Sequence, residues 1–140
     1  SSGDARGFEI LRRMREPDGW KLSPVYFNSQ WTYHIDCLHA PLEEGVIAYP
    51  KGDNVFWTPL PKELDDWEVI DISMEDHWEG AENNEPLGNK GIVMPAGTKK
   101  FVKDLEKRGW ECYEVPYPTI WHTFHSGVHC STLSIWREFD

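Results

Sequence analysis

The spacing of apolar residues near the start of the chain predicts an amphipathic helix. Phe8, Leu11 and Met14 recur every three residues and therefore share one face of a helix, with arginines between them. We expect the Asp4 side chain to cap its first turn. Pro17, followed by an Asp-Gly pair, ends the pattern, so the helix should reach about residue 16.

After this helix the pattern changes to short apolar runs separated by turn residues, which is typical of an α/β chain. The predicted strands are 20–27, 31–38, 45–49, 67–72, 91–94, 110–115 and 128–136, the first of them an edge strand because Pro24 interrupts it. The predicted helices are 60–66 and 98–108, the second capped by Thr98 with Phe101, Val102 and Leu105 inward. The polar stretch 73–89 predicts a loop, and the prolines at 116 and 118 predict an extended passage.

A repeat is visible in this order of elements. The triplets Gly19-Trp20-Lys21, Asp66-Trp67-Glu68 and Gly109-Trp110-Glu111 each join the end of a helix to the start of a strand, at spacings of 47 and 43 residues. Gly45-Val46-Ile47 and Gly91-Ile92-Val93 begin two of the units alike. A unit of hairpin, helix and strand that recurs at this period indicates stacked modules.

Composition bounds the class of protein. A chain of 140 residues suits one domain over 1–140. The net charge of −10 argues against nucleic-acid binding, which needs a basic face. Apolar runs are too short to span a membrane. Three widely spaced cysteines make a poor disulfide framework, so we expect reduced thiols and a cytoplasmic protein, with Cys37 and Cys112 as packing residues.

One candidate pair of functional side chains lies in the predicted strand 31–38. Residues two apart on a strand point to the same face, so His34 and Asp36 should project together while Tyr33 and Ile35 face the other side. An imidazole beside a carboxylate suits acid–base chemistry on a bound cation. The alternative is an ordinary solvated face of a half-buried strand.

A candidate nucleophile lies in the predicted closing strand. The same alternation places Cys130 on one face with Val128 and Thr132, while His129 and Ser131 face the other way. A thiol is the best side-chain nucleophile near neutral pH. The alternative is an inert cysteine in the core.

A zinc site is the third alternative. His122, His125 and His129 lie close to Cys130, and three imidazoles with a thiol are a zinc-type donor set. Their spacing fits no usual finger, and adjacent residues on a strand diverge. The sequence therefore predicts no metal and no cofactor.

Taken together, two motifs resemble the guanidino-group-modifying enzymes of the pentein superfamily: amidinotransferases, arginine deiminases and dimethylargininases. The motifs are His34-Ile35-Asp36 and Gly127-Val128-His129-Cys130-Ser131-Thr132, in the family's order, and the resemblance is greatest to glycine amidinotransferase. It implies an α/β (α+β) chain that forms a partial pentein-type fan of two to three ββαβ modules. The single domain 1–140 would be the C-terminal portion of an amidinotransferase-like α/β propeller.

The resemblance also implies roles for individual residues. Cys130 would attack the guanidinium carbon of an arginine-like substrate, and His34 would act as acid and base. Asp36 would hold the guanidinium group by paired hydrogen bonds. His129 would support the site, and Asn83 lies near a polar position that lines the family's site.

Departures from the family pattern limit what the resemblance implies. A single Gly127 precedes the His-Cys pair where the family has a run of glycines, and Asn84-Glu85-Pro86 stands where the family has an apolar strand. Family members are considerably longer, and their acid that orients the catalytic histidine lies upstream of the residues present here. We therefore expect a fragment whose uncovered sheet edges and tryptophans lead to a homo-oligomer, or are covered by missing N-terminal modules.

The function therefore has two main alternatives. The first is an amidinotransferase-like enzyme, or its remnant, that works through a covalent Cys-amidino intermediate on a small guanidino substrate; a guanidine hydrolase is the less favoured form of it. The second is a non-catalytic binding or assembly module with the same fold. A zinc-binding domain is the weakest reading.

Overall fold

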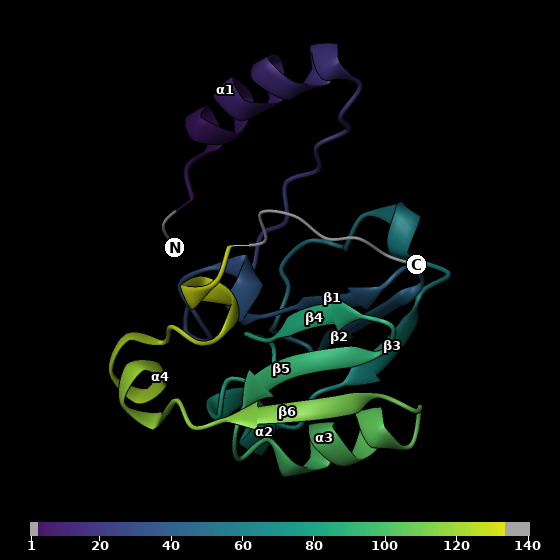
Figure 1. Cartoon of the computed structure of the whole chain (residues 1–140). Helices are drawn as coiled ribbons and strands as arrows, with labels where there is room; N and C mark the ends of the chain where they lie inside the picture. Colours follow the sequence, from purple (N-terminus) through teal and green to yellow (C-terminus); the bar gives the residue numbers. More distant parts are fainter. Residues whose placement is uncertain (1–2, 134–140) are drawn as a thin grey trace.

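The computed structural model describes residues 3–133, which form two small sheets with helices around them (Figure 1). The first sheet contains β1 (Ala40–Glu43), β2 (Val46–Tyr49) and β3 (Glu68–Asp71) in that order, and the second contains β4 (Glu85–Gly88), β5 (Gly91–Pro95) and β6 (Glu111–Val115). The α-helices are α1 (Ala5–Arg15), α2 (Met74–Trp78), α3 (Lys99–Glu106) and α4 (Pro118–Phe124). The short 3₁₀ helices are η1 (Glu16–Asp18), η2 (Ile35–Cys37), η3 (Lys62–Leu64) and η4 (His129–Ser131).

The predicted repeat is confirmed for the triplets at 66–68 and 109–111, because both sheets are built in the same way. The triplet at 19–21 leads into no strand. In each sheet, the first two strands pair antiparallel and the third pairs parallel with the second. Pro41 opposes Ile47 in the first unit and Pro86 opposes Ile92 in the second, and the register shifts after each proline. Proline is tolerated there because β1 and β4 are edge strands that need not donate from every position. These two strands lie next to each other, so the two units meet through their first strands (Figure 1).

One apolar cluster holds the two units together. Ala48 and Ile70 come from the first sheet, Ile92 and Met94 from the second, and Phe101 from α3, and all are buried. Phe101 was predicted to face inward and does so, with no exposed surface. The connection in the first unit carries only η3, where a short helix was expected, so α3 is the one full helix packed in this way among the described residues.

Helix α1 lies apart from this core (Figure 1). Its predicted cap is confirmed, since the Asp4 carboxylate accepts a hydrogen bond from Arg6 N at 2.7 Å. The helix has no buried residue, however, and Ile10 and Met14 are more than half exposed. No helix in the described part of the chain is long and apolar enough to cross a membrane.

Several predicted elements are wrong. Residues 20–27 form no strand beyond one bridge between Phe27 and Phe56, and 31–38 form a turn and η2 rather than a strand. The expected loop 73–89 contains α2 and β4, the expected extended passage contains α4, and the expected closing strand begins as η4. The rest of that strand, 134–136, lies outside the described residues. The first two errors arose because strand propensity in aromatic runs yields to tertiary context.

The cap of α3 also differs from the prediction. The Thr98 hydroxyl donates to Pro95 O at 3.1 Å and makes no cap. The carboxylate of Asp76, which belongs to α2, caps α3 instead. Its Oδ2 accepts from Phe101 N at 2.8 Å and its Oδ1 accepts from Lys100 N at 3.4 Å. Asp76 is buried, so its charge is compensated by the free N–H groups at the start of the helix.

We predict that Asp76→Ala lowers the free energy of unfolding by about 2 kcal/mol, because buried N–H groups lose a charged acceptor. Urea unfolding followed by circular dichroism measures the change. Asp66→Ala, which removes an exposed carboxylate, is the matched control and should change stability by less than about 0.5 kcal/mol. Equal effects of the two substitutions would contradict the assigned cap.

Candidate active site

Three turns meet at the candidate site. Asp36 and Cys37 belong to η2, which precedes β1; Asn83 precedes β4; and Cys130 belongs to η4. Because β1 and β4 begin the two repeated units and lie next to each other, the turns that lead into them are brought together. The third turn is added by the chain that follows α4.

The Cys130 sulfur has polar partners on two sides. It donates a hydrogen bond to Asp36 Oδ2 at 3.1 Å, and it accepts one from Asn83 Nδ2 at 3.0 Å. The Asn83 side chain is fully buried and also accepts from the backbone N–H of Cys130 at 3.1 Å through its Oδ1. The amide therefore fixes both the backbone and the sulfur of Cys130.

Gly127 is required by the same contact. A Cβ atom at this position would lie 2.7 Å from Asn83 Oδ1, closer than real Cβ contacts allow. The backbone N–H of His129 also donates to Asn83 O at 3.3 Å. The segment 127–130 thus lies directly against Asn83, and only glycine lets it come so close.

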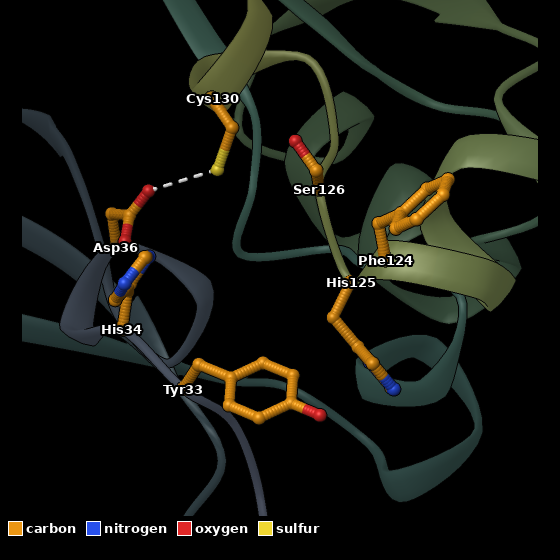
Figure 2. Close-up of a pocket in the computed structure, with 7 residues that line it drawn as sticks. All are labelled: Tyr33, His34, Asp36, Phe124, His125, Ser126 and Cys130. Carbon is orange, nitrogen blue, oxygen red and sulfur yellow. Dashed lines mark hydrogen bonds between the residues drawn. The ribbon is translucent and has the colours of Figure 1, made fainter. Parts of the chain in front are cut away.

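The Cys130 thiol opens onto a pocket of about 510 Å³ (Figure 2). Tyr33, His34 and Asp36 form one wall, and Phe124, His125, Ser126 and Cys130 form the other. His34 is exposed and lies beside Asp36, from the same turn. Among the described residues, no lysine or arginine lines the pocket, and the one carboxylate that does so is that of Asp36, which suits a cationic ligand.

Helix α4 positions the second wall. The Trp121 indole N–H donates to Trp78 O of α2 at 2.7 Å, and its ring lies against Gly80, where a Cβ would be 2.7 Å away. This contact docks α4 on the second unit. His125, at the left-handed C-cap of α4, then turns the chain toward the pocket, with its ring 5.9 Å from that of Tyr33.

Strand alternation did not describe these positions correctly. Tyr33 was expected on the opposite face from His34 and Asp36, but all three line the pocket because the segment is a turn rather than a strand. On η4, His129 is not one of the residues that line the pocket, and its Nδ1 lies 2.9 Å from Glu85 Oε2. Its supporting role, like the other roles assigned from the resemblance, stays a prediction.

The zinc alternative based on the C-terminal histidines is not supported by the arrangement. His122 Nε2 lies 3.6 Å from a Glu79 carboxylate oxygen, His125 lines the pocket and His129 pairs with Glu85. Within residues 3–133, the one group with metal-compatible spacing is Asp36, Cys37 and Cys130, whose ligand atoms lie within 4.8 Å of one another.

Comparison with solved structures identifies the architecture. SxtG, an amidinotransferase from Microseira wollei in the saxitoxin biosynthetic pathway, matches with a TM-score of 0.82 and 21% identity over 98% of this chain and 40% of its own. Inosamine-phosphate amidinotransferase StrB1 from Streptomyces griseus matches with a TM-score of 0.79 and 20% identity over 99% and 42%. DDAH from Pseudomonas aeruginosa, complexed with citrulline, matches with a TM-score of 0.70 and 21% identity over 89% and 44%.

The chain has part of the pentein fold. It spans about two fifths of the length of the solved structures that it matches. No family model matches the sequence, and a search of curated proteins finds no match. The two units of Figure 1, the second a full ββαβ unit and the first with η3 in place of the helix, are two modules of the pentein fan, which confirms the predicted α/β class and the lower bound of two modules.

Cys37 was not predicted to belong to the candidate site. Cys37 was expected to be a packing residue, and it is buried, but its sulfur lies 3.9 Å from the Cys130 sulfur and 3.2 Å from Asn83 Nδ2. Burial, and then the charge of Asp36, raise the pKa of Cys37, so this thiol stays protonated at neutral pH. No local spacing signals a contact between residues 37 and 130.

We predict that Gly127→Ala lowers the free energy of unfolding by about 1–3 kcal/mol, because the new methyl group overlaps Asn83. Urea unfolding measures the loss. Gly7→Ala is the control: a Cβ at Gly7 in α1 meets nothing within 4 Å, so this variant should be no less stable than the parent. A Gly127→Ala protein as stable as the parent would show that the contact with Asn83 is absent in solution.

Proposed function

We propose that the chain is the nucleophile-bearing, C-terminal portion of an amidinotransferase-like enzyme that acts on a small guanidino substrate. The observation that carries the proposal is the Cys130 thiol, 3.1 Å from the Asp36 carboxylate at the edge of a pocket whose described lining holds no lysine or arginine. A nucleophile and an anion at this spacing suit a planar cation whose central carbon is the electrophile.

Binding begins with charge. The Asp36 carboxylate is half-buried, so it attracts a guanidinium group more strongly than a fully solvated carboxylate would. A guanidinium group can donate two parallel N–H bonds to one carboxylate. This fixes the plane of the cation and places its carbon near Cys130 Sγ, which touches the same carboxylate.

Attack by sulfur is the first chemical step. The Cys130 thiol gives its proton to His34 as the sulfur–carbon bond forms, and collapse of the tetrahedral carbon breaks its bond to the leaving nitrogen. His34, exposed in the same pocket, gives the leaving amine its proton. The amidino group then remains on Cys130. Asn83 keeps the sulfur in place throughout, since it contacts both the backbone and the side chain of Cys130.

The second step returns the thiol. An acceptor amine attacks the amidino carbon while His34 takes its proton, the carbon–sulfur bond breaks, and His34 passes that proton to the Cys130 sulfur. Water in place of the amine would make the chain a hydrolase, as in DDAH. We favour transfer, because amidinotransferases give the TM-scores of 0.82 and 0.79, while two DDAH structures give 0.70 and 0.73 and an arginine dihydrolase gives 0.74.

The proposal includes further modules or copies. The chain spans about two fifths of the length of its structural neighbours, and the one acid among the described residues that line the pocket is Asp36, which the proposal assigns to the guanidinium group. Either missing N-terminal modules or a second copy would cover the exposed apolar surface.

His129, paired with Glu85, would hold η4 from outside the pocket. A cytoplasmic location would keep Cys130 reduced.

We predict that Cys130 prefers chloroacetamidine, a cationic alkylating reagent, to the neutral reagent chloroacetamide. The ratio of the two labelling rates should be higher for Cys130 than for a small free thiol. Asp36→Asn should remove this preference while labelling by the neutral reagent continues, because only the cation uses the carboxylate. His34→Ala should lower labelling by the cationic reagent as well. Mass spectrometry of the intact protein measures the rates.

Cys130→Ser is the matched control for these labelling experiments and should take up no reagent in the pocket. Cys112, on β6, reports the background: burial raises its pKa to about 11, so its labelling should be slow and unchanged by Asp36→Asn. An equal preference for the cation in the parent and in Asp36→Asn would reject the proposed function. A bound but unreacted guanidino ligand would favour the non-catalytic binding module.

We also predict self-association at micromolar concentration, because α1 exposes Ile10 and Met14 and Trp20 is 65% exposed. Size-exclusion chromatography with light scattering should show a dimer or larger species, and Met14→Glu should shift it toward the monomer. Arg13→Glu, on the same helix, is the control: it adds negative charge to α1 without removing an apolar side chain. A clean monomer of the parent would contradict this prediction.

A further inference from the structure

Cys37 and Cys130 form a pair of thiols that the proposed chemistry does not need. Their sulfurs lie 3.9 Å apart, and the Asn83 amide contacts both, at 3.2 Å and 3.0 Å. Cys37 is 2% exposed, whereas Cys130 is exposed at the pocket. One sulfur of the pair is therefore open to solutes, and the other is held behind it.

We propose that Cys37 and Cys130 are an oxidation site, at which a hydroperoxide converts the two thiols into a reversible disulfide that switches off the nucleophile. The proposal rests on the proposed function only for the consequence, the loss of a reactive Cys130. The disulfide itself depends on the positions of the two sulfurs.

The accessible thiol reacts first. Cys130 attacks the peroxide, its sulfur is oxidised to a sulfenic acid, and the peroxide is reduced to the corresponding alcohol, or to water if it is hydrogen peroxide. Cys37 is not a competing target, because it is buried and because burial and Asp36 raise its pKa. The site thus has a defined order, with Cys130 as the oxidised sulfur and Cys37 as the resolving one.

Cys37 then closes the bond. Its sulfur attacks the sulfenic sulfur, the S–O bond breaks, and the hydroxyl group leaves with the Cys37 proton as water. The sulfurs must approach from 3.9 Å to about 2.0 Å, the length of a disulfide. Both residues lie in short 3₁₀ turns rather than in the sheets, so a small shift of η4 brings them together without breaking a strand pair.

The short distance to a resolving thiol also protects the site. A sulfenic acid without a neighbouring thiol goes on to sulfinic acid, which thiol reductants do not reverse. A disulfide is reduced by exchange with a small thiol. Cys37 would thus convert an irreversible loss of Cys130 into a reversible one.

The test uses the full chain and hydrogen peroxide as the probe. After limited oxidation and denaturation, free thiols should fall from three to one, and peptide mapping without reductant should find residues 37 and 130 linked within one chain. Dithiothreitol should restore all three thiols. Cys112→Ser should form the same link, because that residue lies on β6 and not in the pair.

Cys37→Ala and Cys37→Ser separate the proposal from its alternatives, and circular dichroism establishes that either variant is folded. In the folded variant, Cys130 should go on to sulfinic acid and labelling by chloroacetamidine should not return with dithiothreitol, whereas it returns in the parent. Equal irreversible oxidation of Cys130 in parent and variant, or a link that involves Cys112, would overturn the proposal. A 37–130 link in a protein without preference for the cationic reagent would uphold it and reject the proposed function.

Discussion

The site depends on the side chain of Asn83. Its amide reaches the sulfur of Cys130 at 3.0 Å and the sulfur of Cys37 at 3.2 Å, and its carbonyl oxygen accepts from the backbone of Cys130 at 3.1 Å. A buried amide that lost these partners would be costly, so the three turns are held in one arrangement by the need to satisfy it. Gly127 and the position of η4 follow from this contact.

The repeat explains why Asn83 is placed there. Each repeated unit begins with an edge strand that carries a proline, and the two edge strands lie side by side, so the turns before them converge. The apolar cluster under the sheets gives the units one relative position. Because the functional side chains lie in turns on a rigid pair of units, the carboxylate and the thiol are held close together without a rearrangement of the sheets.

The sequence predicted the repeated unit and the Asp4 cap correctly, because these rest on local signals. The pattern over 31–38 gave a wrong prediction, because the segment is a turn followed by η2, in which alternate residues do not share a face as they do on a strand. Helix α2 was overlooked although Ser73 and Asp76 carry a capping signal, and the Ser73 hydroxyl does accept from Asp76 N. The contact between Cys37 and Cys130 could not be predicted, because it depends on the docking of α4 and η4 on the second unit.

The central claim is that Asn83 holds the Cys130 sulfur against the Asp36 carboxylate, and the reactivity of Cys130 in Asn83→Ala tests it most directly. In a variant shown to be folded by circular dichroism, we expect Cys130 to react with chloroacetamide but to lose its preference for chloroacetamidine, because the thiol no longer faces the carboxylate. A folded Asn83→Ala protein with the parent's full preference for the cationic reagent would contradict the account.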